Sequence, residues 1–316
     1  MVAIGNFDGV HRGHQAVLTA AAERARARAL VPLVLTFDPH PLEVLAGMHL
    51  DRLTDEERKA QLMARVSPEL ALVVEPFTRE LAANTPEQFA RDFLRDKLRA
   101  AHVIVGANFR FGQGRAGDLG TLQQLGERYG FDAQAEPLLA DAERPISSSR
   151  IRELLRSGEV IEAARLLGRP HSVSGVVVQG DQRGRTIGFP TANISGAVEM
   201  LPPFGVYACL VDDISDGGAG RALGTAVTNL GVRPTVKEQG ALSVEAHLLD
   251  HAPGSSQQGA FSGDLYGRRL RVHFVARLRE ERKFEGLPSL VAQIKADAEQ
   301  AREALKKREP ASVAWV

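Results

Sequence analysis

The chain has 316 residues, and its 39 Lys and Arg balance its 39 Asp and Glu, so the formal net charge is zero. A chain of this length is expected to form two domains, because single domains usually span about 100–200 residues. Zero net charge gives no global field that would attract nucleic acid or an anionic membrane surface, so we expect neither as a partner. Cys209 is the single cysteine, which excludes an intrachain disulfide and argues against zinc ligation.

No stretch of the sequence approaches the roughly 18 consecutive apolar residues that a membrane-spanning helix needs. The N-terminus also lacks a basic segment followed by an apolar one, the pattern of a secretory leader. We therefore expect a cytoplasmic protein.

Up to about residue 168, short apolar runs alternate with amphipathic helical patterns. The predicted strands cover residues 2–5, 31–37, 70–74 and 103–106, with a weaker one near residue 133. The predicted helices cover residues 15–28, 55–65, 86–98, 119–129 and 148–156. This alternation is typical of a parallel sheet with helices on both faces and a ligand at the carboxyl ends of the strands.

Residues 5–14, here called the signature loop, form a glycine-rich turn between the first strand and the first helix. Backbone N–H groups at a helix start lack intrahelical partners and the helix dipole favours an anion there, so this junction predicts a phosphate site. His11 and His14 are three residues apart and share a face if the helix has begun, while Gly13 allows close approach of a ligand. Positioned donors of this kind suit nucleotidyl transfer, in which negative charge grows on phosphate oxygens. The alternative is a polar turn with two solvated histidines.

Two further loops fall at the same predicted edge of the sheet. Residues 36–41 follow the second strand, and their two prolines predict an extended loop. This loop either contributes to the ligand site or is a rigid connection without a role in binding. Asn108 follows the fourth strand together with Phe109 and Phe111. These side chains would lie beside a flat heterocycle, or the two rings would belong to the core.

Residues 112–117 match the Gly-x-Gly-x-x-Gly fingerprint of dinucleotide-binding folds, and Asp132 lies 20 residues after Gly112. That fingerprint normally follows the first strand and opens a helix. Here it follows a polar loop after the fourth strand. We therefore expect a mobile glycine-rich loop that covers a bound nucleotide, and not a dinucleotide fingerprint.

A serine-rich segment opens the last helix of this half. Ser147 and Ser148 offer capping oxygens and hydroxyl donors, and Arg150 offers a planar fork for phosphate oxygens. The alternative is a capped surface helix with a solvated arginine.

After about residue 168 the pattern becomes β-rich. Strands are predicted over residues 172–178, 205–211, 223–230, 242–249 and 270–278, separated by Gly, Asp and Pro, so we expect antiparallel connections and a small closed barrel. Apolar residues from 287 to 305 recur at helical spacing and predict a helix with one face on the barrel. We expect residues from about 308 onward to form a loose tail.

A second polar site is predicted inside this β-rich half. Residues 180–193 hold three glycines and are too polar for a strand, which favours a phosphate-cradling loop with Arg185 supplying charge. Thr191 and Asn193 alternate onto one side of an extended segment and offer two hard oxygens for a magnesium ion that keeps most of its waters. Glu245 and His247 share one face of a strand. A carboxylate there can accept a hydroxyl proton during attack on phosphorus, although a plain exposed strand face is the alternative.

These motifs together resemble a known family. The signature loop and the Ser-Ser-x-Arg-Ile-Arg element after it resemble the HxGH nucleotidyltransferase superfamily, in the form found in bacterial FAD synthetases. Residues 180–193, 205–208, 229–235, 245–247 and 265–267 look like the riboflavin kinase module, and Phe-Pro-Thr-Ala-Asn is the most specific piece. Over roughly residues 1 to 305, the chain is similar to the bacterial bifunctional riboflavin kinase/FMN adenylyltransferases.

The resemblance implies an α/β fold in three parts. Residues 1–168 would form a Rossmann-like HxGH nucleotidyltransferase domain with a parallel sheet. Residues 169–307 would form a small antiparallel β-barrel kinase domain with a C-terminal helix, and residues 308–316 a tail. It further implies phosphorylation of riboflavin to FMN and adenylylation of FMN to FAD, with ATP as cosubstrate, Mg²⁺ as cofactor, and a monomer or weak homo-oligomer.

The family would make Glu245 the general base that activates the ribityl 5′-hydroxyl of riboflavin, and Thr191 and Asn193 ligands of magnesium and ATP. His11 and His14 would be the catalytic residues of adenylyl transfer, in which FMN attacks the α-phosphorus and pyrophosphate leaves. The ATP- and FMN-binding residues implied for the first domain are Gly5, Phe7, Asp8, His11, His14, Asn108, Ser147, Ser148 and Arg150. Those implied for the kinase are Gly180, Arg185, Gly188, Pro190, Thr191 and Asn193.

The sequence departs from the family's pattern in two places. Members usually carry a longer segment before the signature loop, so the first strand is shortened or the start codon is misassigned, and we expect a less stable first domain. Restoring an upstream extension and comparing melting transitions tests this. Residues 251–260 are inserted where the family runs almost directly onward. Their composition predicts a flexible hairpin extension whose deletion leaves kinase turnover nearly intact.

Two other functions compete with the bifunctional enzyme. In one, a domain holds flavin without turning it over, and FMN is the sole product. In the other, the first domain is a different nucleotidyltransferase, acting on pantetheine or nicotinate mononucleotide, with an unrelated barrel attached.

Overall fold

The computed structural model describes residues 1–141, 144–180, 188–217, 220–232, 242–249 and 264–306. The chain folds into two compact units, Met1–Ser148 and Ser149–Val316. Our boundary between the two domains at residues 168 and 169 stays a prediction.

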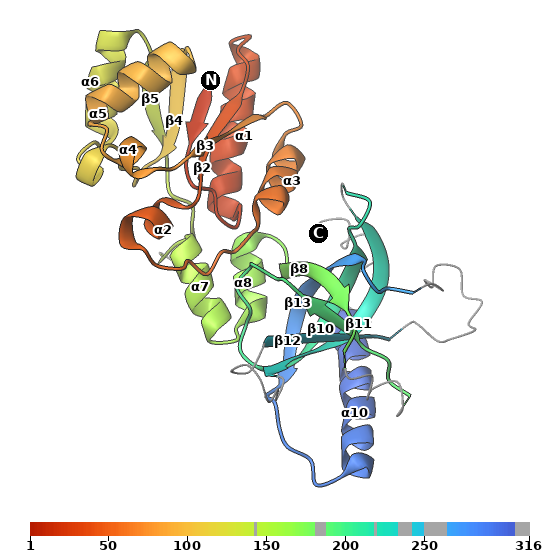
Figure 1. Ribbon diagram of the computed structural model, residues 1–316. Helices are drawn as coiled ribbons and strands as arrows, with labels where there is room; N and C mark the ends of the chain where they lie inside the picture. Colours follow the sequence, from red (N-terminus) through yellow and green to blue (C-terminus); the bar gives the residue numbers. More distant parts are fainter. Residues whose placement is uncertain (142–143, 181–187, 218–219, 233–241, 250–263, 307–316) are drawn as a thin grey trace. The chain divides into compact units, whose positions relative to one another are not determined.

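The first unit is built on a five-stranded parallel sheet in the order β3-β2-β1-β4-β5 (Figure 1). Its strands are β1 (Val2–Ile4), β2 (Leu33–Asp38), β3 (Ala71–Pro76), β4 (His102–Gly106) and β5 (Asp132–Glu136). The predicted parallel sheet is confirmed. The order reverses between β1 and β4, and this switch point is where open α/β sheets bind ligands at the carboxyl ends of their strands.

Helices cover both faces of this sheet because alternate strand residues point to opposite sides. Ala3, Val34 and Ile104 face α1 (Arg12–Ala27) and α3 (Glu56–Val66). The opposite face packs Val2, Ile4, Leu35 and Val103 against the other helices of the unit. The packing residues come from the π-helix η1 (Phe89–Lys97), which continues the short helix α5 (Pro86–Gln88), and from α6 (Leu119–Tyr129).

We had predicted that residues 36–41 form an extended loop. This is wrong for the end of the segment, because a short helix begins at Pro41. The Nδ1 atom of His40 accepts a hydrogen bond from the amide of Leu42 at 3.2 Å, and Glu43 Oε2 accepts one from the amide of His40 at 3.0 Å. This reciprocal capping starts α2 (Pro41–Ala46), and proline suits a first helical turn because it lacks an N–H donor. A further short helix, α4 (Arg79–Ala82), was also not predicted.

The glycine run at residues 112–117 is a packed turn and not a dinucleotide fingerprint. Phe111 and Gly117 exchange two backbone hydrogen bonds, at 3.0 and 2.9 Å, and the run contains only the 3-10 turn η2 (Gln113–Arg115). A Cβ atom at Gly112 would lie 2.7 Å from Pro86, and one at Gly117 would lie 2.6 Å from the ring of Phe111. The glycines therefore allow close packing. Phe111 is buried in the core, with the ring of Phe109 stacked on it at 5.6 Å, so the core interpretation of these rings is confirmed.

The first unit ends in the hairpin of β6 (Ala140–Asp141) and β7 (Arg144–Pro145). The helices α7 (Ser148–Arg156) and α8 (Val160–Leu167) follow, of which only α7 was predicted.

The second unit contains a closed six-stranded barrel in the order β10-β11-β12-β9-β8-β13, in which every pair is antiparallel. Its strands are β8 (His171–Val178), β9 (Ala192–Ser195), β10 (Gly205–Asp213), β11 (Arg221–Val232), β12 (Leu242–Leu248) and β13 (Arg269–Arg279). The predicted barrel is confirmed, and its strand β9 begins at the end of residues 180–193, which we had expected to form a loop with an extended end.

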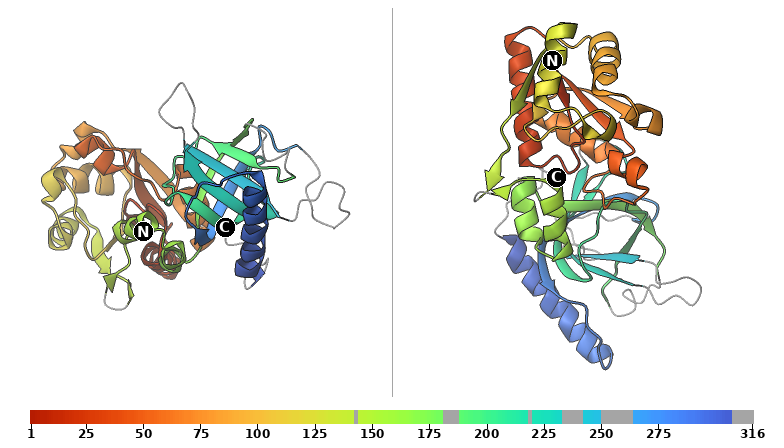
Figure 2. Two further views of the ribbon diagram at one scale, coloured as in Figure 1. Left: turned by 90° about the horizontal axis from the view of Figure 1, so that it is seen from below. Right: turned by 90° about the vertical axis from the view of Figure 1, so that its left-hand side faces the viewer.

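The C-terminal helix α10 (Leu287–Lys306) packs along the outside of this barrel (Figure 2). Ala301 and Leu305 are buried against Ala208, Leu210 and Val275 of the barrel strands, as the helical spacing had predicted. Leu287, in the first turn, does not share this packing, since 63% of it is exposed.

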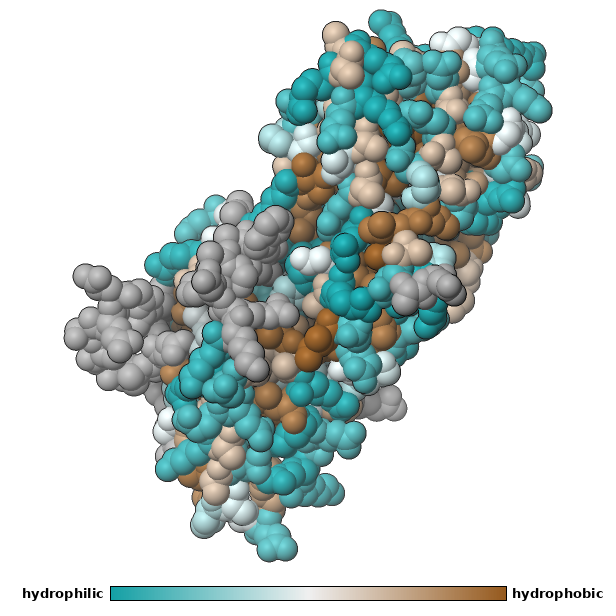
Figure 3. All heavy atoms as spheres, turned by 180° about the vertical axis from the view of Figure 1, so that it is seen from behind, coloured by the Kyte–Doolittle hydropathy of each residue, from teal (hydrophilic) through white to brown (hydrophobic). Residues whose placement is uncertain are grey.

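Hydrophilic and hydrophobic residues are interspersed on the surface seen in Figure 3. Among the residues described by the structure, none of the helices combines the length and the apolar character needed to cross a membrane.

Candidate functional site

The signature loop leaves the carboxyl end of β1 in an unusual backbone conformation. Phe7 and Val10 have positive φ angles of 50° and 37°, and Gly9 between them has 83°. Positive φ is uncommon for residues with side chains and persists only where the surroundings enforce it. The amide of Gly5 donates to Leu35 O at 3.1 Å, and the amide of Val10 donates to Phe7 O at 3.0 Å. These bonds hold the turn that delivers the chain into α1.

The two histidines of the loop come together as predicted. His11 is the residue that caps α1, and its Nδ1 atom accepts a hydrogen bond from the amide of His14 at 3.3 Å. The two imidazole rings stack with their centroids 3.6 Å apart, and the ring of Phe7 meets that of His14 edge-on at 5.2 Å. Because His11 is only 4% exposed, the alternative of a turn with two solvated histidines is wrong.

His14 is held in its neutral form. Burial lowers its pKa well below the usual value of 6.5, and electrostatic interactions with His11 and Lys59 lower it further. Its Nδ1 atom is buried and makes no hydrogen bond to the described part of the chain. A neutral imidazole at pH 7 carries one N–H donor and one acceptor nitrogen, so His14 can donate a hydrogen bond to a ligand or accept one from it.

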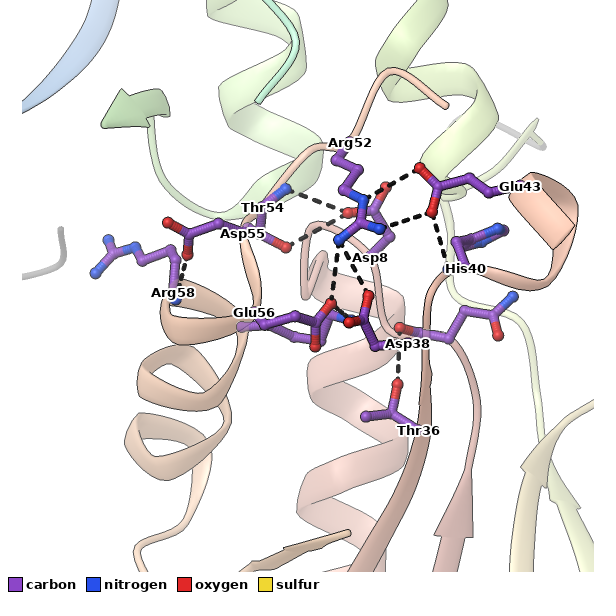
Figure 4. Close-up of polar contacts among 12 residues, drawn as sticks. Asp8, Thr36, Asp38, His40, Glu43, Arg52, Thr54, Asp55, Glu56 and Arg58 are labelled. Carbon is purple, nitrogen blue, oxygen red and sulfur yellow. Dashed lines mark hydrogen bonds and ion pairs between the residues drawn. The ribbon is translucent and has the colours of Figure 1, made fainter. Parts of the chain in front are cut away.

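The carboxylate of Asp8 fastens the loop to the segment before α3 (Figure 4). Asp8 Oδ1 accepts hydrogen bonds from the amides of Leu53 and Thr54 at 3.0 and 3.2 Å, and from the Thr54 hydroxyl at 3.4 Å. The carbonyl oxygen of Asp8 accepts a hydrogen bond from the Ser148 hydroxyl at 2.9 Å. The structure therefore shows that Asp8 holds the loop in place, and it brings the predicted Ser148 to that loop.

The remaining predicted residues of the first site lie on several other elements. Gly5 lies at the end of β1, where a Cβ atom would come within 3.1 Å of the Phe7 ring. Asn108 is exposed after β4, which pairs directly with β1. Ser147 is partly exposed immediately before α7, and Arg150 lies in the first turn of α7, within the second compact unit.

In the barrel, Glu245 is the centre of a row of polar side chains. It lies directly opposite Asn193 of β9 and directly opposite Asn229 of β11. Residues opposite each other in paired strands point to the same face, so the three side chains line up across three strands. The Ser243 hydroxyl donates a hydrogen bond to Glu245 Oε1 at 2.8 Å. The structure thus joins two residues predicted for the kinase site, Asn193 and Glu245.

The chain before β9 is fitted closely to this row. A Cβ atom at Gly180 would lie 2.3 Å from the side-chain nitrogen of Asn193, so any other residue there would displace the Asn193 side chain. The Nδ1 atom of His247 lies 2.8 Å from Pro190 O, within hydrogen-bonding distance, and the His247 ring meets Phe189 edge-on at 5.4 Å. The predicted Gly188 has a φ of 87°, and Thr191 is partly exposed next to β9. Arg185 lies outside the described residues.

Known proteins share both halves of this arrangement. A family model of FAD synthetase matches residues 1–150, and one of riboflavin kinase matches residues 167–305. The bifunctional riboflavin kinase/FMN adenylyltransferase of Escherichia coli strain K12 is 40% identical over 315 residues, which cover 98% of this chain and 94% of the relative. The chain belongs to the bifunctional riboflavin kinase/FMN adenylyltransferase family. The protein of the same name from Bacillus subtilis is 34% identical, and the match covers 95% of this chain and 91% of the relative.

A solved structure also matches over almost the whole chain. It is described as a macrolide-efflux protein from Streptococcus pneumoniae, with a TM-score of 0.82 and 29% identity, and the match covers 95% of this chain and 93% of the other. The family assignment and both family models disfavour a different nucleotidyltransferase with an unrelated barrel, because the riboflavin kinase model spans the barrel.

Several side chains at the two bifunctional-family sites were not singled out from sequence. Lys59 is buried, and its Nζ atom lies 2.6 Å from Glu56 Oε1, close enough to His14 to affect its pKa. In the sequence it is one of several charged residues of an amphipathic helix. Asn229 belongs to the motif at residues 229–235, but only the strand register places it opposite Glu245. Ser243 lies two residues before Glu245 on the same strand, so the alternation of strand side chains could have found it.

The barrel site offers oxygen ligands for a metal. Among the residues described, no group of three or more His, Cys, Asp or Glu side chains could hold a metal ion. Thr191, Asn193 and Glu245 instead supply hydroxyl, amide and carboxylate oxygens around paired β9 and β12. This donor set fits Mg²⁺, which is usually bound by few protein oxygens together with waters and substrate phosphates.

Proposed function

We propose that this chain uses the barrel site to phosphorylate riboflavin to FMN and the signature-loop site to convert FMN into FAD. ATP is the cosubstrate of both reactions. The observation that carries the proposal is that the stacked His11 and His14 and the paired Asn193 and Glu245 occur on one chain of the bifunctional family.

Adenylyl transfer is assigned to the start of α1. A phosphate oxygen of FMN attacks the α-phosphorus of ATP, and pyrophosphate leaves. Helix N–H groups and imidazole N–H groups of His11 and His14 stabilise the negative charge that grows on the phosphate oxygens. The residues proposed to bind ATP or FMN are Gly5, Phe7, Asp8, His11, His14, Asn108, Ser147, Ser148 and Arg150.

Riboflavin phosphorylation is assigned to the row around Glu245. Its carboxylate accepts the proton of the 5′-hydroxyl as that oxygen attacks the γ-phosphorus of ATP, and ADP leaves. Thr191 and Asn193 would hold a magnesium ion, which supplies charge neutralisation on the phosphate oxygens when bound. Gly180, Arg185, Gly188 and Pro190 are the other residues proposed to bind ATP or flavin.

The wider biology of the chain is proposed on the same basis. We propose a cytoplasmic monomer or weak homo-oligomer that binds small molecules and neither nucleic acid nor membranes. The zero net charge supports the absence of polyanionic partners, and a single, buried cysteine is consistent with a reducing compartment.

A product assay tests the proposed function. Purified protein is incubated with riboflavin, ATP and Mg²⁺, and the flavins are separated by chromatography at successive times. We expect FMN to appear first and FAD to follow, with both reactions stopped by a chelator and restored by excess Mg²⁺. FMN as the sole product would mean that the first domain binds flavin without turnover. Unchanged kinase rates in the chelator would contradict the proposed magnesium site.

A further inference from the structure

The signature loop is buttressed by a segment that none of the sequence motifs includes. Residues 52–54 lie between the short helix α2 and α3, and Leu53 and Thr54 contact the loop. Figure 4 shows Thr54 beside Asp8. Thr54 is only 3% exposed and Asp8 only 4%. Buried hydrogen bonds of this kind restrict geometry strongly, because breaking one leaves a polar group without water or partner.

Thr54 contacts the loop on two sides of its strained turn. Its hydroxyl accepts a hydrogen bond from the amide of Gly9 at 3.2 Å and donates one to Asp8 Oδ1 at 3.4 Å. Its own amide donates to the same carboxylate oxygen at 3.2 Å. Gly9 lies between two residues with positive φ, so Thr54 supports the part of the loop that the backbone alone would not favour.

Arg52 anchors the outer side of the same segment. Its guanidinium donates to both carboxylate oxygens of Glu43, at 2.6 and 3.3 Å, and lies 3.1 Å from Asp38 Oδ1 and 3.9 Å from Glu56 Oε1. These carboxylates belong to α2, to the end of β2 and to α3. A bidentate arginine pair fixes orientation as well as distance. Arg52 therefore ties the segment to three elements around the edge of the sheet.

We propose that Arg52 and Thr54 are positioning residues for adenylyl transfer, holding the signature loop so that His11, His14 and the helix N–H groups meet the reacting phosphates. Neither residue is assigned a contact with substrate. Misplacing catalytic donors by about 1 Å can lower a rate by about 100-fold, so loosening the loop should reduce turnover more than substrate binding.

The test uses Thr54→Val, which removes the hydroxyl and preserves the shape, beside Thr54→Ser, which keeps the hydroxyl. Thr121→Val is the matched control, because the Thr121 hydroxyl also donates to an aspartate, Asp118, at 3.0 Å, but on α6. FAD formation from FMN is measured for each, and FMN formation from riboflavin by the same chain serves as an internal control.

We expect Thr54→Val to lower kcat for adenylyl transfer by about 10- to 100-fold, with KM for ATP and FMN within about threefold of wild type. Thr54→Ser should recover most of kcat, and Thr121→Val should match wild type. Kinase rates should stay the same in all variants. A kcat within twofold of wild type for Thr54→Val, an equal loss in Thr121→Val, or a loss confined to KM would overturn the proposal.

If Thr54→Val does not fold, Arg52→Gln tests the proposal instead, because it removes the ion pairs that tie residues 52–54 to the neighbouring elements. A clear drop in adenylyl kcat at unchanged KM supports the proposal, and an unchanged kcat refutes it. The inference rests on the proposed adenylyl transfer at the signature loop. If the wild type makes no FAD from FMN, the proposed function fails; if wild type and Thr54→Val are equally active, only the present inference fails.

Discussion

At the scale of single residues, the first candidate site contains a histidine that the fold keeps uncharged. His14 stacks on His11, and its pKa is lowered first by burial and then by electrostatic interactions with His11 and Lys59. The unfolded chain therefore binds more protons than the folded one between the lowered pKa and 6.5. The stability that His14 contributes is fully present above pH 6.5, and it is lost as the pH falls from 6.5 towards the lowered pKa.

We accordingly predict that the first domain loses stability below pH 6.5, with His14 contributing at most about 1.4 kcal/mol per pH unit. Thermal unfolding of the full chain at pH 5.5 to 8 checks this, and His14→Gln should flatten the acidic limb. His49→Gln, which replaces an exposed histidine of the same domain, is the control. An identical pH dependence in His14→Gln and wild type would contradict the prediction.

Glu245 carries the corresponding prediction in the barrel. If its carboxylate accepts the hydroxyl proton, Glu245→Gln keeps the shape and the Ser243 contact but loses the base. We expect riboflavin phosphorylation to fall by about 100-fold or more, with FAD formation from added FMN retained. Glu299→Gln, at a side chain that is 76% exposed, controls for loss of a carboxylate. Retention of more than half of the kinase rate in Glu245→Gln would remove Glu245 from this role.

At the scale of elements, the helix α10 is joined to the barrel by more than its apolar face. Arg279 of β13 donates to both oxygens of Asp297, with Nη2 2.7 Å from Oδ2, and Gln293 also donates to Asp297 at 2.6 Å. The Asp297 side chain is 3% exposed and that of Arg279 is 20% exposed. Removing one partner of such a pair leaves an uncompensated charge.

We predict that Asp297→Ala destabilises the barrel domain by about 3 kcal/mol, the lower end for a broken buried pair. The urea concentration that halves kinase activity measures this and should fall clearly. Glu299→Ala breaks an exposed pair on the same helix and should shift the free energy of unfolding by about 0.5 kcal/mol or less. Equal midpoints for the two variants would show that the buried pair contributes nothing.

The same scale shows what could be predicted from sequence. Strongly periodic segments such as α1, β2 and α10 were predicted because burial of one face leaves a regular pattern. β9 was not, because a strand of four residues is too short to show that pattern, and α2 was not, because a helix of six residues without a buried side chain has no apolar face to reveal it. The roles of Lys59 and Arg52 could not be predicted, since they depend on the proximity of Lys59 to His14 and of Arg52 to Asp38, which come from other segments of the chain.

At the scale of the whole molecule, two sites of different chemistry occur on one chain of the bifunctional family. The first site is formed by a strained loop at the switch point of a parallel sheet, and the second by a polar row across three barrel strands. Each proposed site has its own catalytic residues, so a substitution at one site should stop one reaction and leave the other intact.

The most direct test incubates His14→Ala and Glu245→Ala, separately and mixed, with riboflavin, ATP and Mg²⁺, and separates the flavin products by chromatography. We predict that His14→Ala stops largely at FMN and that Glu245→Ala leaves riboflavin unchanged but converts added FMN to FAD. The equimolar mixture should make FAD from riboflavin, because FMN released by one variant reaches the other. If either substitution abolishes both reactions, or if Glu245→Ala still phosphorylates riboflavin at the wild-type rate, the assignment of one reaction to each site is wrong.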